Sequence, residues 1–142
     1  MDCIFCDIVE RKAKAEILFE NENIISFLDI RPVNFGHTLV IPKKHYKDFL
    51  SLPDAELREL IKITQQMSNA VVNGLGSDGF NLIVNNGTAA GQTVFHFHFH
   101  IIPRLSNDFN FKPRFKNYDI GGMKDFAEKI RTAVNNSKEV HG

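Results

Sequence analysis

The segment whose residues could do chemistry reads VFHFHFHII, from Val94 to Ile102. Side chains of a β-strand alternate between its two faces, so this spacing predicts a strand with His96, His98 and His100 on one face and phenylalanines on the other. The phenylalanine face is typical of a packed core. Three imidazoles in register exceed what packing requires, so we expect the histidine face to be functional. The alternatives are an exposed polar face that happens to use histidine, and core histidines whose hydrogen bonds are satisfied by the backbone.

Histidines are common metal ligands, but the spacing argues against one ion held by all three. His96 and His100 are separated by four residues, or about 13 Å along a strand. Two ligand nitrogens on one zinc ion lie only about 3–4 Å apart. Nucleophilic or acid–base chemistry remains. A histidine with a pKa of about 6.5 is largely neutral at cellular pH, and its attack on phosphorus gives a phosphoramidate that water can cleave.

Two cysteines form a second candidate site near the N-terminus. Cys3 and Cys6 are spaced so that both thiolates can reach one ion from a single turn. A closed zinc site needs four ligands, and His45 and His96 are the best further donors in the sequence. A redox pair or two buried thiols would show the same cysteine spacing, so both alternatives stay open.

The elements that must position these residues follow from hydrophobic periodicity. Strands are expected at residues 16–20, 24–29, 38–41, 80–85 and 94–102, and a short helix at 3–11. A long amphipathic helix begins after residues 51–54 and ends at Gly74, and a C-terminal helix follows Gly121 and Gly122. Residues 136–142 are expected to fray. The pattern predicts an α+β fold whose central antiparallel sheet of about five strands accompanies one long helix and a C-terminal helix.

Composition limits the classes of partner. The 142 residues are 43% hydrophobic and fit a single domain spanning 1–142. Seventeen basic and seventeen acidic residues give a net charge of zero, which argues against binding nucleic acid or membrane through bulk charge. No apolar run is long enough to cross a membrane, and the N-terminus does not read as a secretory signal. We therefore expect a cytoplasmic protein with reduced thiols.

Several motifs together resemble the histidine triad (HIT) superfamily. They are the triad in GQTVFHFHFHIIPR at 91–104, the opening CIFC at 3–6, FLDI at 27–30, GHTLVIPKKH at 36–45, and NNG at 85–87. The resemblance covers most of the chain. It implies a homodimer of α+β protomers whose central sheets join into one. It also implies hydrolase or transferase chemistry at the α-phosphate of a nucleotide, with a purine nucleotide as the expected partner.

The resemblance also implies roles for individual residues. His98 would be the nucleophile, His100 would contact the phosphate, His96 would help to orient the strand, and His37 would orient or polarise the site. Asp29 would bind the ribose hydroxyls. The phosphate or leaving group would be held by Asn85, Gly91, Gln92 and Thr93, and the base by Phe5, Ile8, Phe27 and Ile30. A turn role is the alternative for Asp29 and Asn85, capping of a strand edge for His37, and a core role for the four base-pocket residues.

Some HIT relatives carry zinc on such a cysteine pair plus two histidines. Because all four positions are present, the resemblance implies structural zinc on Cys3, Cys6, His45 and His96. The expected activity is hydrolysis of dinucleoside polyphosphates or nucleoside phosphoramidates through a nucleotidyl-histidine intermediate, with release of a nucleoside monophosphate. The alternatives are nucleotidyl transfer and a zinc-stabilised nucleotide-binding or scaffold module whose turnover is incidental.

Overall fold

The structure is a computed structural model that describes residues 2–108 and 112–141. The chain divides into two compact units, residues 1–109 and 110–142, which are described separately. All of the predicted site residues belong to the first unit. The expectation of a single domain over residues 1–142 stays a prediction.

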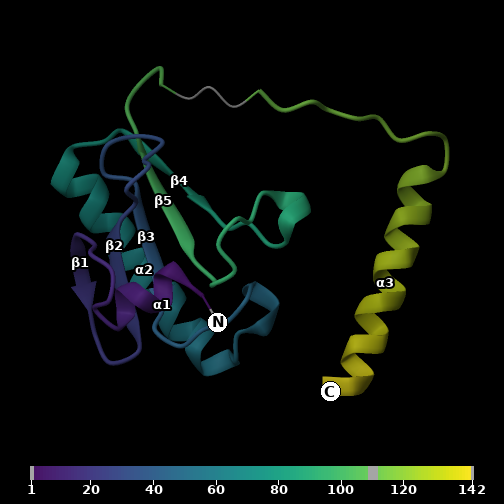
Figure 1. The fold of residues 1–142 in the computed structure, drawn as a ribbon. Helices are drawn as coiled ribbons and strands as arrows, with labels where there is room; N and C mark the ends of the chain where they lie inside the picture. The colour runs from purple at the N-terminus through teal and green to yellow at the C-terminus, as the bar shows by residue number, and fades with distance from the viewer. Residues whose placement is uncertain (1, 109–111, 142) are drawn as a thin grey trace. The chain divides into compact units, whose positions relative to one another are not determined.

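The first unit is built on a five-stranded antiparallel sheet with the strand order β1-β2-β3-β5-β4 (Figure 1). This confirms the predicted α+β class and the antiparallel sheet. The strand boundaries fall within a few residues of the expected ones, except for β5. The strands are β1 (Ile17–Glu20), β2 (Ile24–Leu28), β3 (Thr38–Pro42), β4 (Gly79–Ile83) and β5 (Phe99–Arg104).

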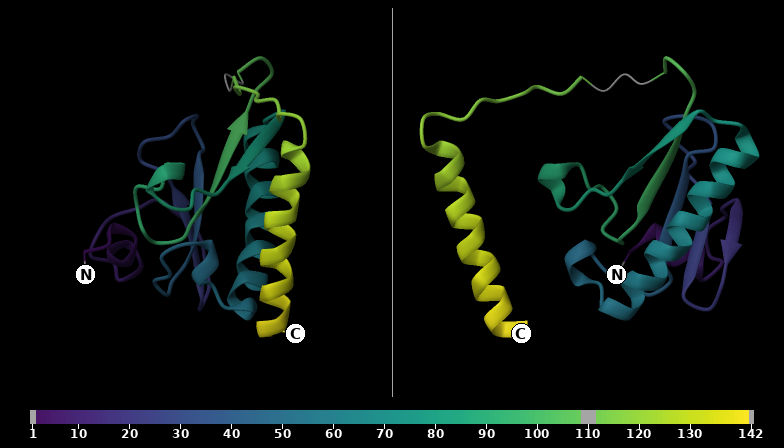
Figure 2. Two further views of the ribbon diagram at one scale, coloured as in Figure 1. Left: turned by 90° about the vertical axis from the view of Figure 1, so that its right-hand side faces the viewer. Right: turned by 180° about the vertical axis from the view of Figure 1, so that it is seen from behind.

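Helices cover both faces of this sheet. Helix α2 (Asp54–Leu75) packs its Leu60 and Met67 onto one face, where they meet Val40 of β3. The short helix α1 (Ile4–Val9) packs onto the other face, where Phe5 joins the core around Leu39. The views in Figure 2 show α2 running along the sheet. The alternation of side chains along β3 therefore separates two cores, and the histidine-bearing face is the α1 face.

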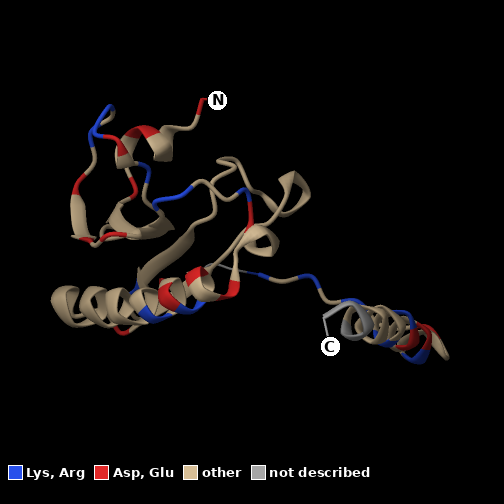
Figure 3. Ribbon diagram, turned by 90° about the horizontal axis from the view of Figure 1, so that it is seen from below, with Lys and Arg blue, Asp and Glu red and all other residues tan. Residues whose placement is uncertain are grey.

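Helix α2 is the long amphipathic helix that the periodicity predicts. Asp54 and Glu56 lie in its first turn, where the helix dipole favours negative charge, and Gly76 ends it in the left-handed conformation. Its charged residues all lie at or before Lys62, so residues 63–75 carry none (Figure 3). The later half of α2 is consequently an uncharged surface.

The predicted strand over residues 94–102 is partly wrong. β5 begins only at Phe99, and residues 94–98 have irregular backbone. The neighbouring strands explain the difference, because β3 pairs no further than Val40 with Phe99, and β4 ends with Ile83 opposite His100. Residues 94–98 therefore extend beyond the ladder, and only His100 of the three histidines belongs to a strand.

The second unit consists of irregular residues 112–119, a turn, and helix α3 (Gly122–His141). This is the predicted C-terminal helix, and it continues through residues 136–141, where fraying was expected. Its apolar positions are largely exposed within the unit: Met123, Phe126, Ile130 and Val134. No helix in the described part of the chain is long and apolar enough to cross a membrane.

Candidate active site and metal centre

A cavity of about 520 Å³ opens on the α1 face of the sheet, beside the histidines. It lies between α1, the end of β2 and the segment that precedes β5. Most of its lining side chains are aliphatic or aromatic, and the polar ones are Lys14, Asp29, Arg31, Thr93, His98 and His100. Eight predicted site residues line it: Phe5, Ile8, Phe27, Asp29, Ile30, Thr93, His98 and His100.

His98 is held so that one ring nitrogen is free for attack. Its Nδ1 lies 2.7 Å from the backbone oxygen of His96. A carbonyl oxygen can only accept a hydrogen bond, so Nδ1 carries the proton and the lone pair resides on Nε2. Burial lowers the pKa of His98, which favours the neutral ring. The Phe5 ring packs against this imidazole in a T-shaped arrangement, with 5.0 Å between the centroids.

His37 and His100 form a second ordered pair. The backbone N–H of Val33 donates to His37 Nδ1 over 3.1 Å, so His37 carries its proton on Nε2. That Nε2–H donates to His100 Nδ1, 2.9 Å away, which leaves His100 with its own proton on Nε2. Burial lowers the pKa of both histidines, that of His100 to about 4. His100 is therefore a neutral hydrogen-bond donor at the cavity.

Asp29 follows β2 at the rim of the same cavity. One carboxylate oxygen accepts a hydrogen bond from the backbone N–H of Arg31 over 2.9 Å. The other oxygen lies 3.7 Å from His37 Nε2. The first contact fixes the rotamer of Asp29, and the second oxygen retains capacity to accept hydrogen bonds from a ligand in the cavity.

Three predicted contacts to phosphate or leaving group do not line the cavity: Asn85, Gly91 and Gln92. Gln92 is buried, with 3% of its surface exposed. Its Oε1 accepts from the Gly87 N–H, and its Nε2 donates to the backbone oxygens of Lys47 and Val94. These hydrogen bonds hold the loop that precedes the histidines, so Gln92 has a structural role in this loop. A contact with phosphate stays a prediction for all three.

The four predicted metal ligands lie together. One ligand atom from each of Cys3, Cys6, His45 and His96 falls within 4.8 Å of every other. His96 Nδ1 lies 3.5 Å from both sulfurs, and His45 Nδ1 lies 3.4 Å from that of Cys6. In a tetrahedral site with Zn–S bonds of about 2.3 Å and Zn–N bonds of about 2.1 Å, sulfur and nitrogen are roughly 3.6 Å apart. The donor set and its spacing fit zinc.

Hydrogen bonding around His96 also fits a metal ligand. Its Nε2 lies 2.7 Å from the backbone oxygen of Pro42, so Nε2 carries the proton and Nδ1 turns a lone pair toward the sulfurs. Without a cation, burial and the neighbouring Cys3 raise the pKa of Cys6 to about 11. A bound zinc ion favours the thiolate and reverses this effect.

A second group, Asp29, His37 and His100, has ligand atoms equally close together. Here the protonation pattern argues against a metal. The Val33 N–H occupies the lone pair of His37 Nδ1, so the nitrogen facing the group carries a proton. The sequence thus places metal-competent and hydrogen-bonded histidine clusters side by side, and the backbone partners distinguish them.

Sequence reasoning missed several groups of this site. Lys14 and Arg31 line the cavity, as do Ile4, Ala15, Leu28, Leu39 and Val94. Arg31 is close enough to Asp29 in sequence to have been a candidate, whereas Lys14 has no local signal. The carbonyl of His96 and the N–H of Val33 decide the tautomers, and backbone groups of this kind leave no mark on residue type.

Known proteins resemble this chain over most of its length. A sequence profile of the HIT domain matches residues 10–107. An uncharacterized HIT-like protein of Methanocaldococcus jannaschii is 50% identical over 106 residues, 75% of this chain and 81% of that protein. Adenylylsulfatase HINT3 of Arabidopsis thaliana is 43% identical over 107 residues, 75% of this chain and 54% of that protein.

A solved structure shows the same fold. The crystal structure of a zinc-bound histidine triad family protein from Mycobacterium smegmatis is 38% identical and superposes with a TM-score of 0.74, covering 94% of this chain and 98% of that one. The motifs, the profile match and the shared fold agree. The chain belongs to the histidine triad (HIT) family.

Proposed function

We propose that this protein is a nucleotide hydrolase that acts at the α-phosphate through a covalent nucleotidyl intermediate on His98. The observation that carries the proposal is the 2.7 Å contact between His98 Nδ1 and the His96 carbonyl, which leaves a neutral Nε2 lone pair beside a nucleotide-sized cavity. The family supports action on nucleotides. The activity of the Arabidopsis relative, as named, supports hydrolysis of adenylyl sulfate.

The reaction has two displacement steps. In the first, His98 Nε2 attacks the α-phosphorus; a phosphorus–nitrogen bond forms, and the bond to the leaving group breaks with its electron pair on that group. In the second, water attacks the same phosphorus, the phosphorus–nitrogen bond breaks, and a nucleoside monophosphate and one proton are released. The His100 Nε2–H donates to a non-bridging phosphoryl oxygen, and Asp29 accepts from the ribose hydroxyls.

The leaving group is the part of the substrate that this site constrains least. A polyphosphate, an amine or a sulfate on an adenylyl group would each present the same α-phosphorus to His98. Lys14 and Arg31 bring positive charge to a cavity that takes an anion. We propose dinucleoside polyphosphates and nucleoside phosphoramidates as the substrate classes, with adenylyl sulfate as a third. Capture of the intermediate by phosphate would make the protein a transferase.

We further propose that Cys3, Cys6, His45 and His96 hold a structural zinc ion. The spacing of sulfur and nitrogen and the tautomer of His96 support this assignment. The ion would join three separate segments, namely the N-terminal turn, the chain after β3 and the chain before β5. Because the protein would provide all four ligands, the ion would have no open position and would stabilise the fold rather than take part in the reaction.

A direct test uses the nucleophile. We expect His98→Ala to lose nearly all release of AMP from a fluorogenic adenosine phosphoramidate, diadenosine polyphosphate and adenylyl sulfate, because no other group has a free lone pair at that position. Its melting temperature and its affinity for AMP serve as controls for folding and for an intact cavity. Full turnover by the variant would refute the mechanism.

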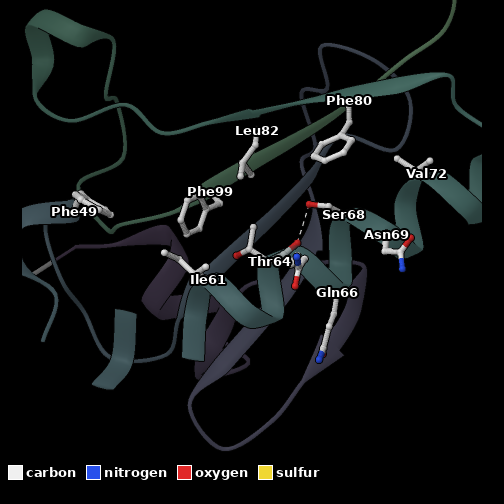
Figure 4. Close-up of a pocket in the computed structure, with 11 residues that line it drawn as sticks. Phe49, Ile61, Thr64, Gln66, Ser68, Asn69, Val72, Phe80, Leu82 and Phe99 are labelled. Carbon is white, nitrogen blue, oxygen red and sulfur yellow. Dashed lines mark hydrogen bonds between the residues drawn. The ribbon is translucent and has the colours of Figure 1, made fainter. Parts of the chain in front are cut away.

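We also propose that two copies associate through β4. This strand is an edge of the sheet, and its Phe80, Leu82 and Ile83 side chains are exposed. Beside it, a second cavity of about 720 Å³ lies between β4 and α2 (Figure 4). Every residue lining that cavity is uncharged, as is typical of the centre of a subunit interface. Pairing of two β4 strands would join the sheets and cover these side chains.

A further inference from the structure

Helix α1 lies between the two candidate sites and takes part in both. Cys3, just before the helix, and Cys6, within it, belong with His45 and His96 to the group of proposed zinc ligands, called the cluster below. Phe5 and Ile8 of the same helix line the nucleotide cavity. The Phe5 ring makes edge contacts with His98 at 5.0 Å and with His96 at 5.9 Å between centroids. One turn of helix thus forms a wall of the cavity on one side and half of the ligand set on the other.

The polar attachment of this helix is confined to the cluster. Among the described residues, the hydrogen bonds that join residues 3–9 to any part of the chain beyond residue 13 are the sulfur–imidazole contacts to His45 and His96. A helix of six residues is not stable alone, so its position depends on what it packs against and what it is tied to. The buried Phe5 and Ile8 pack against the rest of the protein, and the cluster provides the hydrogen bonds that connect the helix to distant parts of the chain.

The cluster also holds the backbone that sets the nucleophile. The His96 side chain is buried within the cluster, while its carbonyl oxygen accepts from His98 Nδ1. Residues 94–98 have no strand partner, and they are held instead by hydrogen bonds from Gln92 Nε2 to Val94 O, from His96 Nε2 to Pro42 O and from the Phe97 N–H to Tyr46 O. His45, one of the proposed zinc ligands, lies in the segment 42–46, which provides the Pro42 and Tyr46 acceptors. Displacement of the cluster would therefore move the carbonyl that fixes His98.

We infer that the cluster and the nucleotide cavity are thermodynamically linked, so that zinc and a nucleoside monophosphate each raise the affinity of the protein for the other. The inference rests on the proposed function, because it needs a nucleotide in the cavity. Linkage requires the two effects to be equal: the factor by which AMP tightens zinc binding is the factor by which zinc tightens AMP binding. A metal that merely stabilised a distant part of a protein that stays folded with and without zinc would show no such coupling.

The test follows zinc rather than turnover. Zinc-loaded protein is mixed with a colorimetric chelator, and the rate of metal transfer is recorded with and without saturating AMP. We expect saturating AMP to slow the transfer and, in equilibrium competition with the chelator, to lower the dissociation constant for zinc at least about fivefold, the lower end of typical coupling between sites. Calorimetry of AMP binding to loaded and zinc-stripped protein should then give the same ratio of dissociation constants. A dissociation constant for zinc that AMP leaves unchanged would overturn the inference and leave the proposed function standing.

Two variants locate the coupling. Phe5→Leu changes the ring that contacts both sites, and we expect AMP at saturation to slow zinc transfer less in this variant than in the wild type. Ile30→Ala is the matched control, because Ile30 lines the cavity but does not belong to α1; it should keep the full slowing once AMP is saturating. Equal slowing in all three proteins would exclude α1 as the link. Failure of every form to bind AMP would refute the proposed function as well.

Discussion

At the scale of single residues, backbone groups decide which imidazole nitrogen does what. The His96 carbonyl accepts from His98 Nδ1 and so leaves His98 Nε2 unprotonated. The Val33 N–H places the proton of His37 on Nε2, and because that proton is donated to His100 Nδ1, the proton of His100 is on Nε2. The residue types were predictable from the sequence, since three histidines in alternation are a strong pattern. Their tautomers were not, because any residue type can supply a backbone N–H or carbonyl.

Asp29 offers a prediction about ribose recognition. We expect wild-type protein to bind AMP at least about tenfold more tightly than 2′,3′-dideoxy-AMP, because a carboxylate that accepts hydroxyl hydrogen bonds contributes about 1.5–3 kcal/mol. Asp29→Ala should bind the two nucleotides equally. Calorimetry of both proteins with both nucleotides gives the four dissociation constants, and from them the coupling between the Asp29 carboxylate and the ribose hydroxyls. If the variant kept the wild-type preference for AMP, Asp29 would have no place at the ribose.

His100 offers a prediction about pH. Burial lowers its pKa from 6.5 to about 4, so between these values the unfolded chain takes up a proton that the folded chain does not. The contribution of His100 to the free energy of unfolding should therefore be constant above pH 6.5 and fall by about 2–3 kcal/mol as the pH drops to 4.

The matched control is His100→Asn, which lacks the titrating ring. Urea unfolding of both proteins at several pH values isolates the contribution of His100, since all other groups titrate in both. Parallel pH profiles would show that burial does not perturb this histidine.

At the scale of elements, periodicity predicted most strands and helices, and failed where pairing ends. The side chains of residues 94–98 do alternate between the two faces. Phe97 is buried in the core on the α2 face, and His96 is buried on the α1 face beside Cys3. Alternation alone cannot reveal that β3 and β4 stop before reaching them. Gln92 shows the same limit, because an amide that grips a ligand and one that braces a loop look alike in sequence.

Gly36 shows how closely the β2–β3 loop meets the end of α2. A Cβ at this position would lie 2.2 Å from Leu75 Cδ1, and its φ of +94° disfavours other residues. We expect Gly36→Ala to lower the free energy of unfolding by about 1–3 kcal/mol. Gly74→Ala is the control: nothing lies within 4 Å of its added Cβ, and alanine should stabilise that helical position by up to about 1 kcal/mol. Chemical denaturation of both variants distinguishes the outcomes, and equal effects would contradict the packing of Gly36.

At the scale of the whole molecule, assembly through β4 predicts that a charged substitution disrupts the dimer at one edge of the sheet, β4, and not at the other, β1. Leu82 on β4 and Leu18 on β1 are similarly exposed, at 49% and 46%. We expect Leu82→Lys to shift the protein toward monomer, because pairing would bury two charges, whereas Leu18→Lys should leave the assembly unchanged. Light scattering over a range of concentrations measures both. A dimer unaffected by Leu82→Lys, or disrupted by Leu18→Lys, would place the interface elsewhere.

The claim on which the account depends is that His98 becomes covalently bonded to the α-phosphorus. Rapid quenching of the wild-type protein during turnover of an adenylyl substrate, followed by mass spectrometry of the intact chain and its peptides at neutral to basic pH, measures this directly. We predict a mass increase of one adenylyl group on His98, absent from His98→Ala. An adduct on another residue, or turnover by an unmodified His98 under conditions that preserve phosphoramidates, would contradict the account.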